Sequence, residues 1–166
     1  MGIKQRRGLA DYLNVAAAGG SEKYAFMGSG FTKLDESPSA QTTSKRYVND
    51  KSTTKAISGY DDSFPFETDQ ILSEEAIEYI INIGEKRMTG ADAETTYVRV
   101  DLDKKVGDSS TEFEARKFKV AIEVADFADS DGEMTASGNL LPIGDPVEGK
   151  FDTSTKAFTA TSSVGA

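Results

Sequence analysis

The pattern of apolar positions sets one stretch of the chain apart, because it alone repeats with the period of a helix. Between residues 73 and 87 the apolar stripe falls at i, i+3, i+4 and i+7 and consists of Ile77, Ile80, Ile81 and Gly84. That spacing places the stripe on one face of an α-helix. We expect Ser73 to be the N-cap, with Lys86 and Arg87 in the last turn and Gly90 just past the helix end. A lone amphipathic helix must bury its stripe, so the remaining chain should form a sheet.

Apolar and polar residues alternate in most of the remaining segments, as is typical of half-buried strands. The alternation predicts strands over 22–27, 31–34, 63–68, 95–102, 111–125, 134–140, 147–151 and 157–161. In 95–102 we expect one parity to face inward (Val98, Val100, Leu102) and the other to face solvent (Tyr97, Arg99, Asp101). In 111–125 the apolar parity switches between Ala115 and Phe118. This switch near Arg116 and Lys117 predicts a β-bulge or a sharp bend.

Residues 35–60 form the most unusual segment, rich in Ser, Thr and Lys and poor in large apolar side chains. Segments this long without a core pattern are uncommon in compact domains and are usually functional. The Ser and Thr content predicts a long β-ribbon whose tip lies at Asn49-Asp50-Lys51.

The length of 166 residues predicts a single domain over 1–166. Its predicted class is mainly β, a β-sandwich or barrel-like fold with one α-helix packed against the sheet. We expect residues 1–20 to be an N-terminal arm docked through Leu9, Tyr12 and Leu13, and residues 160–166 to be a C-terminal tail.

Composition narrows the possible functions. The net charge is −9, and the acidic excess lies in residues 51–166, with 23 acidic against 12 basic side chains. Such a surface disfavours tight binding of nucleic acid, since phosphates need basic partners. The chain contains no His and no Cys, which removes the usual general base and the thiolate ligands and makes an enzyme improbable. No apolar run reaches the roughly 20 residues that span a bilayer, and no apolar region follows the basic N-terminus as in a secretion signal. We therefore expect no membrane association and no secretion.

Three short motifs resemble known sites, and none fits its pattern. Asp129-Ser130-Asp131-Gly132 looks like part of a calcium loop, but Phe127 and Gly138 would then stand where oxygen ligands are needed. Gly28-Ser29-Gly30 lacks the third glycine and the following helix of a dinucleotide loop. For Arg116-Lys117-Lys119 a solvated strand face is favoured over a phosphate site. We expect no cofactor and no metal.

Several segments together resemble the major tail tube protein of long-tailed bacteriophages. The resemblance covers roughly residues 9–160 and rests on segment order and turn signatures. The segments are Gly30-Phe31-Thr32, Asp35-Glu36-Ser37-Pro38, Lys45-Arg46-Tyr47-Val48-Asn49-Asp50, Phe64-Pro65-Phe66-Glu67, Ser137-Gly138-Asn139-Leu140 and Gly144-Asp145-Pro146-Val147-Glu148-Gly149-Lys150-Phe151.

This resemblance implies a structural subunit of the virion tail, assembled in the cytoplasm of the host bacterium. Six copies would form a ring, and stacked rings would form a hollow tube through which DNA passes without specific binding. The implied partners are other copies of the chain, a tape measure protein, and tail terminator and baseplate proteins. The C-terminal immunoglobulin-like domain that some members of this family carry is expected to be absent, because the chain ends soon after Phe158.

The tube hypothesis assigns roles to particular residues. An acidic wall would repel phosphate and let DNA slide. The ribbon at 35–60 would be the loop that contacts the next ring. The expected inter-ring contacts are Thr42, Lys45, Tyr47, Asn49, Asp50, Lys51, Thr54 and Ile57. The expected lumen acids are Glu67, Glu112, Glu114 and Glu123, and the expected core face of the helix is Ile77, Ile80 and Ile81.

Two alternatives stay open at this point. The chain could be the inner tube of a contractile tail or of a tail-like injection particle. From another class, it could be a small β-sandwich module that binds a carbohydrate or a host surface, although it has no Trp and its 6 Tyr are spread along the chain.

Overall fold

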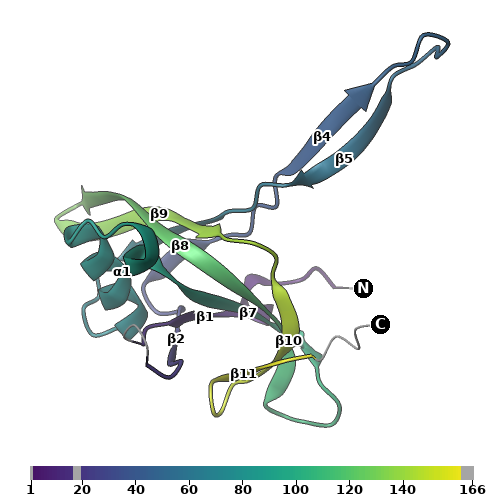
Figure 1. Cartoon of the computed structure of the whole chain (residues 1–166). Coiled ribbons are helices and arrows are strands. Elements are labelled where there is room, and N and C mark those ends of the chain that lie inside the picture. Colours follow the sequence, from purple (N-terminus) through teal and green to yellow (C-terminus); the bar gives the residue numbers. More distant parts are fainter. Residues whose placement is uncertain (1, 17–19, 162–166) are drawn as a thin grey trace.

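The computed structural model describes residues 2–16 and 20–161, and it confirms a mainly β fold with one α-helix against a large antiparallel sheet (Figure 1). The strands of the large sheet are β1 (Leu9–Asn14), β2 (Tyr24–Phe26), β3 (Phe31–Leu34), β6 (Phe64–Asp69), β7 (Glu94–Lys105), β8 (Glu112–Ser130), β9 (Glu133–Pro142), β10 (Val147–Asp152) and β11 (Ala157–Ala160). Two further strands, β4 (Ala40–Lys45) and β5 (Thr54–Tyr60), pair only with each other. The helix is α1 (Glu75–Glu85), and short 3-10 turns are η1 (Arg6–Gly8) and η2 (Gly90–Ala93).

The strand order of the large sheet is β2-β1-β7-β8-β9-β6-β3, with β10 paired to the first half of β8 and β11 paired to β10. The sheet curves strongly. The rings of Phe64 on β6 and Tyr97 on β7 lie 4.9 Å apart although β9 and β8 stand between their strands. It does not close, because its end strands β2 and β3 pair with β1 and β6 and not with each other. The fold is therefore barrel-like with an open seam.

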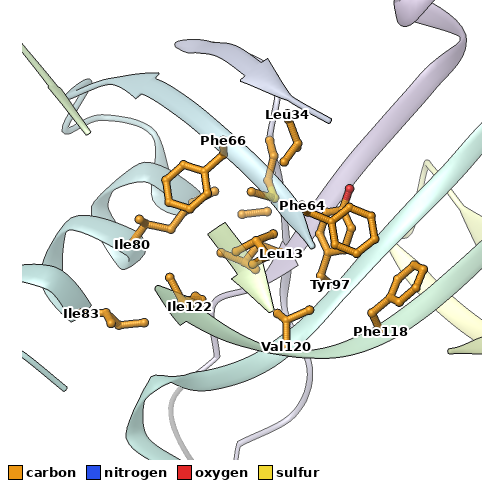
Figure 2. Packing of buried hydrophobic residues seen from close by; sticks show 14 of the residues in the cluster. Leu13, Leu34, Phe64, Phe66, Ile80, Ile83, Tyr97, Phe118, Val120 and Ile122 are labelled. Atoms are coloured by element: carbon orange, nitrogen blue, oxygen red, sulfur yellow. The ribbon is translucent and has the colours of Figure 1, made fainter. Parts of the chain in front are cut away.

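Two apolar cores lie on opposite faces of this sheet. The helix-side core contains Leu13, Ala25, Met27, Leu34, Phe64, Phe66, Ala76, Ile80, Ile83, Ala93, Tyr97, Phe118, Val120, Ile122 and Leu140, most of which are shown in Figure 2. The second core contains Ala10, Tyr12, Tyr24, Val98, Val100, Phe113, Ala115 and Phe151. The ring of Tyr12 on β1 meets that of Phe151 on β10 at 4.4 Å across two intervening strands, so the sheet curves the other way around this second core.

The two cores explain why the predicted bulge near Arg116 and Lys117 is wrong. Strand β8 runs without interruption past these residues, and its pairing with β7 keeps its register from Glu114 to Ala121. Phe113 and Ala115 face the second core, whereas Phe118, Val120, Ile122 and Val124 face the helix-side core. The side chains of β8 alternate between the two faces throughout. What changes along the strand is which of the two faces is covered by a core. The register shift between β8 and β9 lies further on, between Val124 and Asp126.

Strand β7 corrects a second prediction for the same reason. Val98 and Val100 are buried as expected, but Tyr97 and Arg99 are buried as well, at 0% and 4% exposure. When a strand is covered on both faces, neither its odd- nor its even-numbered residues face solvent, so alternation does not identify exposed positions. Asp101 is only partly buried and pairs with Lys4.

The N-terminal arm is also shorter than predicted. Leu9–Asn14 is strand β1, which pairs with both β7 and β2, and its Tyr12 and Leu13 are buried on opposite faces of the sheet. Residues 17–19 of the predicted arm and 162–166 of the predicted tail lie outside the described residues. Within the described residues, no helix has the length and apolar character needed to cross a membrane.

The helix forms as its stripe predicts, since Ile77, Ile80 and Ile81 are all buried. Its start is different. The helix begins at Glu75 after a turn in which the Glu74 amide donates to the Ile71 carbonyl, so Ser73 lies in that turn and is not the N-cap. At its other end Arg87, with φ of +49°, takes the left-handed position. The amides of Arg87 and Met88 donate to the carbonyls of Gly84 and Ile83, which is a Schellman motif. Gly90 is therefore not the stop residue.

Gly84 lets the helix lie close to β8. A Cβ atom added there would stand 2.8 Å from Cγ1 of Val124 and 2.7 Å from the ring of Phe127. We expect Gly84→Ala to lower the free energy of unfolding by about 1 kcal/mol, because overpacking costs about 1–3 kcal/mol and exceeds the helix-propensity gain of about 1 kcal/mol. Thermal and urea unfolding measure this change. The control is Gly59→Ala on β5, where no atom lies within 4 Å; equal stability of the two variants would contradict the close approach.

Candidate functional site

The predicted ribbon is present and projects from the body of the molecule. Strands β4 and β5 pair antiparallel from Ala40–Tyr60 to Lys45–Thr54, and in Figure 1 they extend to the upper right, away from the sheet. Every residue of β4 is exposed, and on β5 only Gly59 is partly covered. An isolated two-stranded ribbon is at best marginally stable in water. A ribbon of this kind is therefore suited to gain its stability from a partner.

The predicted contact residues all lie on this ribbon. Thr42 and Lys45 are on β4, Thr54 and Ile57 on β5, and the others in the tip (Tyr47, Asn49, Asp50, Lys51). The register places Thr42 opposite Ile57, and Lys45 opposite Thr54 on the other face of the ribbon. The set is thus divided between two faces. Asp50 closes the tip, because its carboxylate accepts from the Tyr47 amide at 3.0 Å and its own amide donates to the Tyr47 carbonyl.

Large apolar side chains stand out in solvent along the ribbon. Tyr47 and Val48 are exposed at the tip, and Ile57 and Tyr60 on β5. Ile57 and Tyr60 share one face, because the ladder slips by one residue at Ser58 and compensates for their odd spacing. Several exposed large apolar residues on one projecting element are typical of an interaction surface.

The ribbon also differs in charge from the rest of the protein. Residues 39–60 carry four basic side chains and one acidic one, for a net charge of +3. The remaining chain carries 15 basic and 27 acidic groups, for a net charge of −12. A basic arm on an acidic body is complementary to the body of another copy.

Glu36 anchors the base of the ribbon to the sheet. Its carboxylate accepts two hydrogen bonds of 2.8 Å from the guanidinium of Arg116 on β8, and its Oε1 lies 3.7 Å from Nη1 of Arg99 on β7. The backbones of Ser37 and Ser63 form a bridge beside it. A bidentate arginine–carboxylate pair fixes orientation as well as position, so the ribbon leaves the body in a defined direction.

Beneath Glu36 lies a buried charge network centred on Asp11, which is only 1% exposed. Its carboxylate accepts from the hydroxyl of Tyr97, pairs with Arg6 at 2.5 Å, and lies 3.4 Å from Nε of Arg99. Nε and Nη1 of Arg99 are buried and make no hydrogen bond within the described residues, so their contacts with the carboxylates are ionic. Burial, together with the negative charge of Asp11, raises the pKa of Tyr97 far above its usual value, so the hydroxyl stays a donor.

The network leads to a pH-dependent prediction. The hydrogen bonds from Arg116 hold the pKa of the Glu36 carboxyl below its ordinary value of 4.5, against the opposing effect of burial. Because the folded-state pKa is lowered, this stabilisation is complete above pH 4.5 and is lost as the pH falls through the folded-state pKa. We expect Glu36→Gln to lower the free energy of unfolding by about 1 kcal/mol at pH 7 and to cost less at pH 3, below the ordinary pKa of the carboxyl. Urea unfolding at both values measures this; an equal loss at both would contradict the assignment.

The four predicted lumen acids fall into two groups. The solvent-facing side of β8, β9 and β6, opposite the helix, is here named the open face. Across these strands Glu123 stands opposite Asn139 and then Pro65, and Asp126 stands opposite Ser137 and then Glu67. Residues directly opposite in a ladder share a face. Glu67 and Glu123 therefore lie together on the open face, joined by Asp126.

Glu112 and Glu114 are separated from this pair. They belong to the even parity of β8, on the other side of the sheet from Glu123, and lie at its opposite end. Both have partners, since Glu112 lies 2.6 Å from Lys150 and Glu114 lies 3.9 Å from Lys104. The geometry of a single copy thus divides the four predicted lumen acids between the two sides of the sheet.

The short motifs behave as ordinary structure. Arg116, Lys117 and Lys119 pair with Glu36, Glu22 and Glu94, respectively. Asp131 and Gly132 have φ of +53° and +90° and make the two-residue turn between β8 and β9, while Asp129 accepts from the Gly132 amide at 2.8 Å. Among the described residues no group of three or more acidic side chains could hold a metal ion.

Sequence reasoning missed the Asp11–Arg99 network altogether. Asp11 lies in a segment predicted as an arm, and Arg99 on a strand predicted to be open on one side. One feature of the sequence could have indicated it. Tyr12 and Leu13 are adjacent large apolar residues, and both can be buried only on a strand that is covered on both faces.

Comparisons with known proteins give no assignment. No known protein family matches the chain, and no curated protein matches its sequence.

Proposed function

We propose that this protein is the structural subunit of a bacteriophage tail tube, in which six copies form a ring and rings stack into a hollow tube that conducts DNA. The observation that carries the proposal is the projecting ribbon. It is basic and has exposed apolar side chains, and it extends from an acidic body to which a second copy's ribbon is complementary. Stacking would order this marginal element and cover its apolar residues.

Other features support the same role. The sheet ends at β2 and β3 in strands with one neighbour each, and contacts between subunits would cover such edges. The open face carries Glu67 on β6 and Glu123 and Asp126 on β8, the two strands that flank β9, and repeated in a ring it would supply a wall that repels phosphate. In the virion tail the tape measure, terminator and baseplate proteins would be the partners, and assembly would take place in the bacterial cytoplasm. A tube inside a contractile sheath would use the same surfaces.

A ribbon deletion tests the proposal directly. The Asp61 amide donates to the Ser39 carbonyl at 3.1 Å, so a two-residue Asn-Gly turn can replace residues 40–60 without disturbing the body. We expect concentrated wild-type protein to form hollow tubes in electron micrographs. The deletion variant should fold and should form no tubes. Monodisperse wild-type monomers at every concentration would overturn the proposal and favour a surface-binding module, for which the exposed Tyr47 and Tyr60 would be the contact residues.

The open face leads to a second prediction. Glu67→Lys combined with Glu123→Lys should leave assembly intact and slow DNA release at low salt, because lysine on the wall would hold phosphates. The matched control is Glu112→Lys with Glu114→Lys, which makes the same charge change on the other side of the sheet. Release is measured on particles assembled with each variant. Equal release rates for the two pairs would show that the open face does not line the lumen.

A further inference from the structure

The open seam of the sheet forms a groove that the ribbon does not use. It has a volume of about 660 Å³ and lies between β1–β2 and β3. Its apolar walls include Tyr12, Phe26, Phe31 and Phe113, and Phe26 is about half exposed. Arg6 crosses the seam, donating to the carbonyls of Leu9 and Leu34 at 3.2 Å each. An apolar groove beside two strand edges is a suitable receptor for an extended segment or hairpin.

The rim of this groove is basic, although the body of the protein carries a net negative charge. Arg6, Arg7 and Lys33 line it, together with Asp11, which pairs with both Arg6 and Arg99. Arg7 and Lys33 make no ion pair within the described residues. Two uncompensated cations beside the half-exposed ring of Phe26 and the partly exposed ring of Phe31 favour an occupant that is both acidic and apolar.

The tip of the β8–β9 hairpin has this chemistry. Asp129, Asp131 and Glu133 give it a charge of −3 without any basic residue, and Met134 is about half exposed. The tip also extends past β6, whose pairing with β9 begins only at Thr135. In Figure 1 it lies at the left end of the body, far from η1 and the N-terminus on the right. The hairpin of one copy therefore cannot fill the Arg7 end of its own groove.

We propose that the acidic tip of the β8–β9 hairpin of one copy docks in the basic, apolar groove of a second copy. Met134 contacts the aromatic wall, where its flexible side chain adapts to the groove, and Asp131 and Glu133 face Arg7 and Lys33. The contact joins two different surfaces, so it propagates from copy to copy and closes into a ring when the rotation permits. This proposal rests on the proposed function: the hairpin–groove contact supplies the lateral contact within a ring, and the ribbon supplies the contact between rings.

Charge reversal tests the pairing. The groove variant Arg7→Glu/Lys33→Glu changes the charge of the two unpaired rim positions from +2 to −2, and the hairpin variant Asp131→Lys/Glu133→Lys changes the charge of the tip from −3 to +1. Each alone should raise the concentration needed for assembly by about tenfold or more. An equimolar mixture, and a chain carrying all four changes, should assemble again. Thermal unfolding confirms that each variant folds. The proposal would be overturned if the groove variant and the hairpin variant each assembled like the wild type. It would also be overturned if neither their mixture nor the chain with all four substitutions assembled.

Disulfide cross-linking tests the same contact between two copies independently of tube formation. The chain has no native cysteine, so Lys33→Cys and Glu133→Cys, mixed under oxidising conditions, should give a disulfide-linked heterodimer. The matched control replaces Glu133→Cys with Asp108→Cys, an exposed acid in the turn after β7. Cross-linking by the first pair but not the control supports the contact even if no tube forms, in which case the proposed function alone fails. No preference between the two pairs would overturn the contact, whatever the tubes show.

Discussion

Ile80→Asp is expected to leave the chain without a cooperative folded state. Ile80 is fully buried in the helix-side core, between the helix and the strands behind it (Figure 2). The substitution removes its packing and buries a carboxyl group that has no partner there. An unpaired buried charge costs several kcal/mol, and the loss of the large side chain adds about 2–5 kcal/mol. The sum is comparable to the whole stability of about 5–15 kcal/mol of a typical domain.

The measurement is circular dichroism with thermal unfolding. A matched control is available, because Ile57→Asp makes the same chemical change at an exposed site on the ribbon. The control should melt at the wild-type midpoint. If Ile80→Asp were soluble and melted cooperatively at that midpoint as well, the placement of the helix on the sheet would be wrong.

Asp11→Ala is expected to cost about 3–5 kcal/mol of unfolding free energy, since it leaves Arg99 buried beside a vacant position. Tyr97 also loses its acceptor within the core. The loss of stability comes from the buried Arg99 charge, which then has only Glu36 at 3.7 Å to balance it. It does not measure the net contribution of the Asp11–Arg99 pair, because a buried pair gains little over apolar residues of similar size.

Two comparisons separate these effects. The double variant Asp11→Ala/Arg99→Met removes both charges and should be less destabilised than Asp11→Ala alone. Asp101→Ala breaks a more exposed pair with Lys4 and should cost no more than about 1 kcal/mol. Urea unfolding of the three variants measures the differences; similar losses for Asp11→Ala and Asp101→Ala would contradict a buried network.

The network also bears on the proposed tube. Asp11, Arg99 and Arg116 lie on β1, β7 and β8, and through Glu36 they hold the base of the ribbon. Destabilising Asp11 or Glu36 should therefore loosen the direction of the ribbon while its own residues stay unchanged. In the proposed tube, stacking of rings would depend on that direction, whereas the proposed hairpin–groove contact would not involve the ribbon.

Local pattern alone determined several elements correctly. The helix follows from a 3.6-residue stripe, and the ribbon follows from a Thr- and Ser-rich segment with a polar tip. Each of these depends on residues close together in the sequence. The limits of the helix were less accurate, because Ser73 joined a preceding turn and Arg87 took the left-handed position.

Tertiary structure decided which faces of the strands are covered. Alternation tells which side chains share a face but not how many faces are buried. The second core covers β1, β7 and the first half of β8 from the other side. For this reason the segment predicted as an arm is a strand, and Tyr97 and Arg99 are buried. The parity switch near Arg116 marks the point where the buried face of β8 changes from one core to the other. The Asp11–Arg99 pair and the separation of Glu67 and Glu123 from Glu112 and Glu114 follow from the same arrangement, since both depend on strands distant in sequence that lie side by side in the sheet.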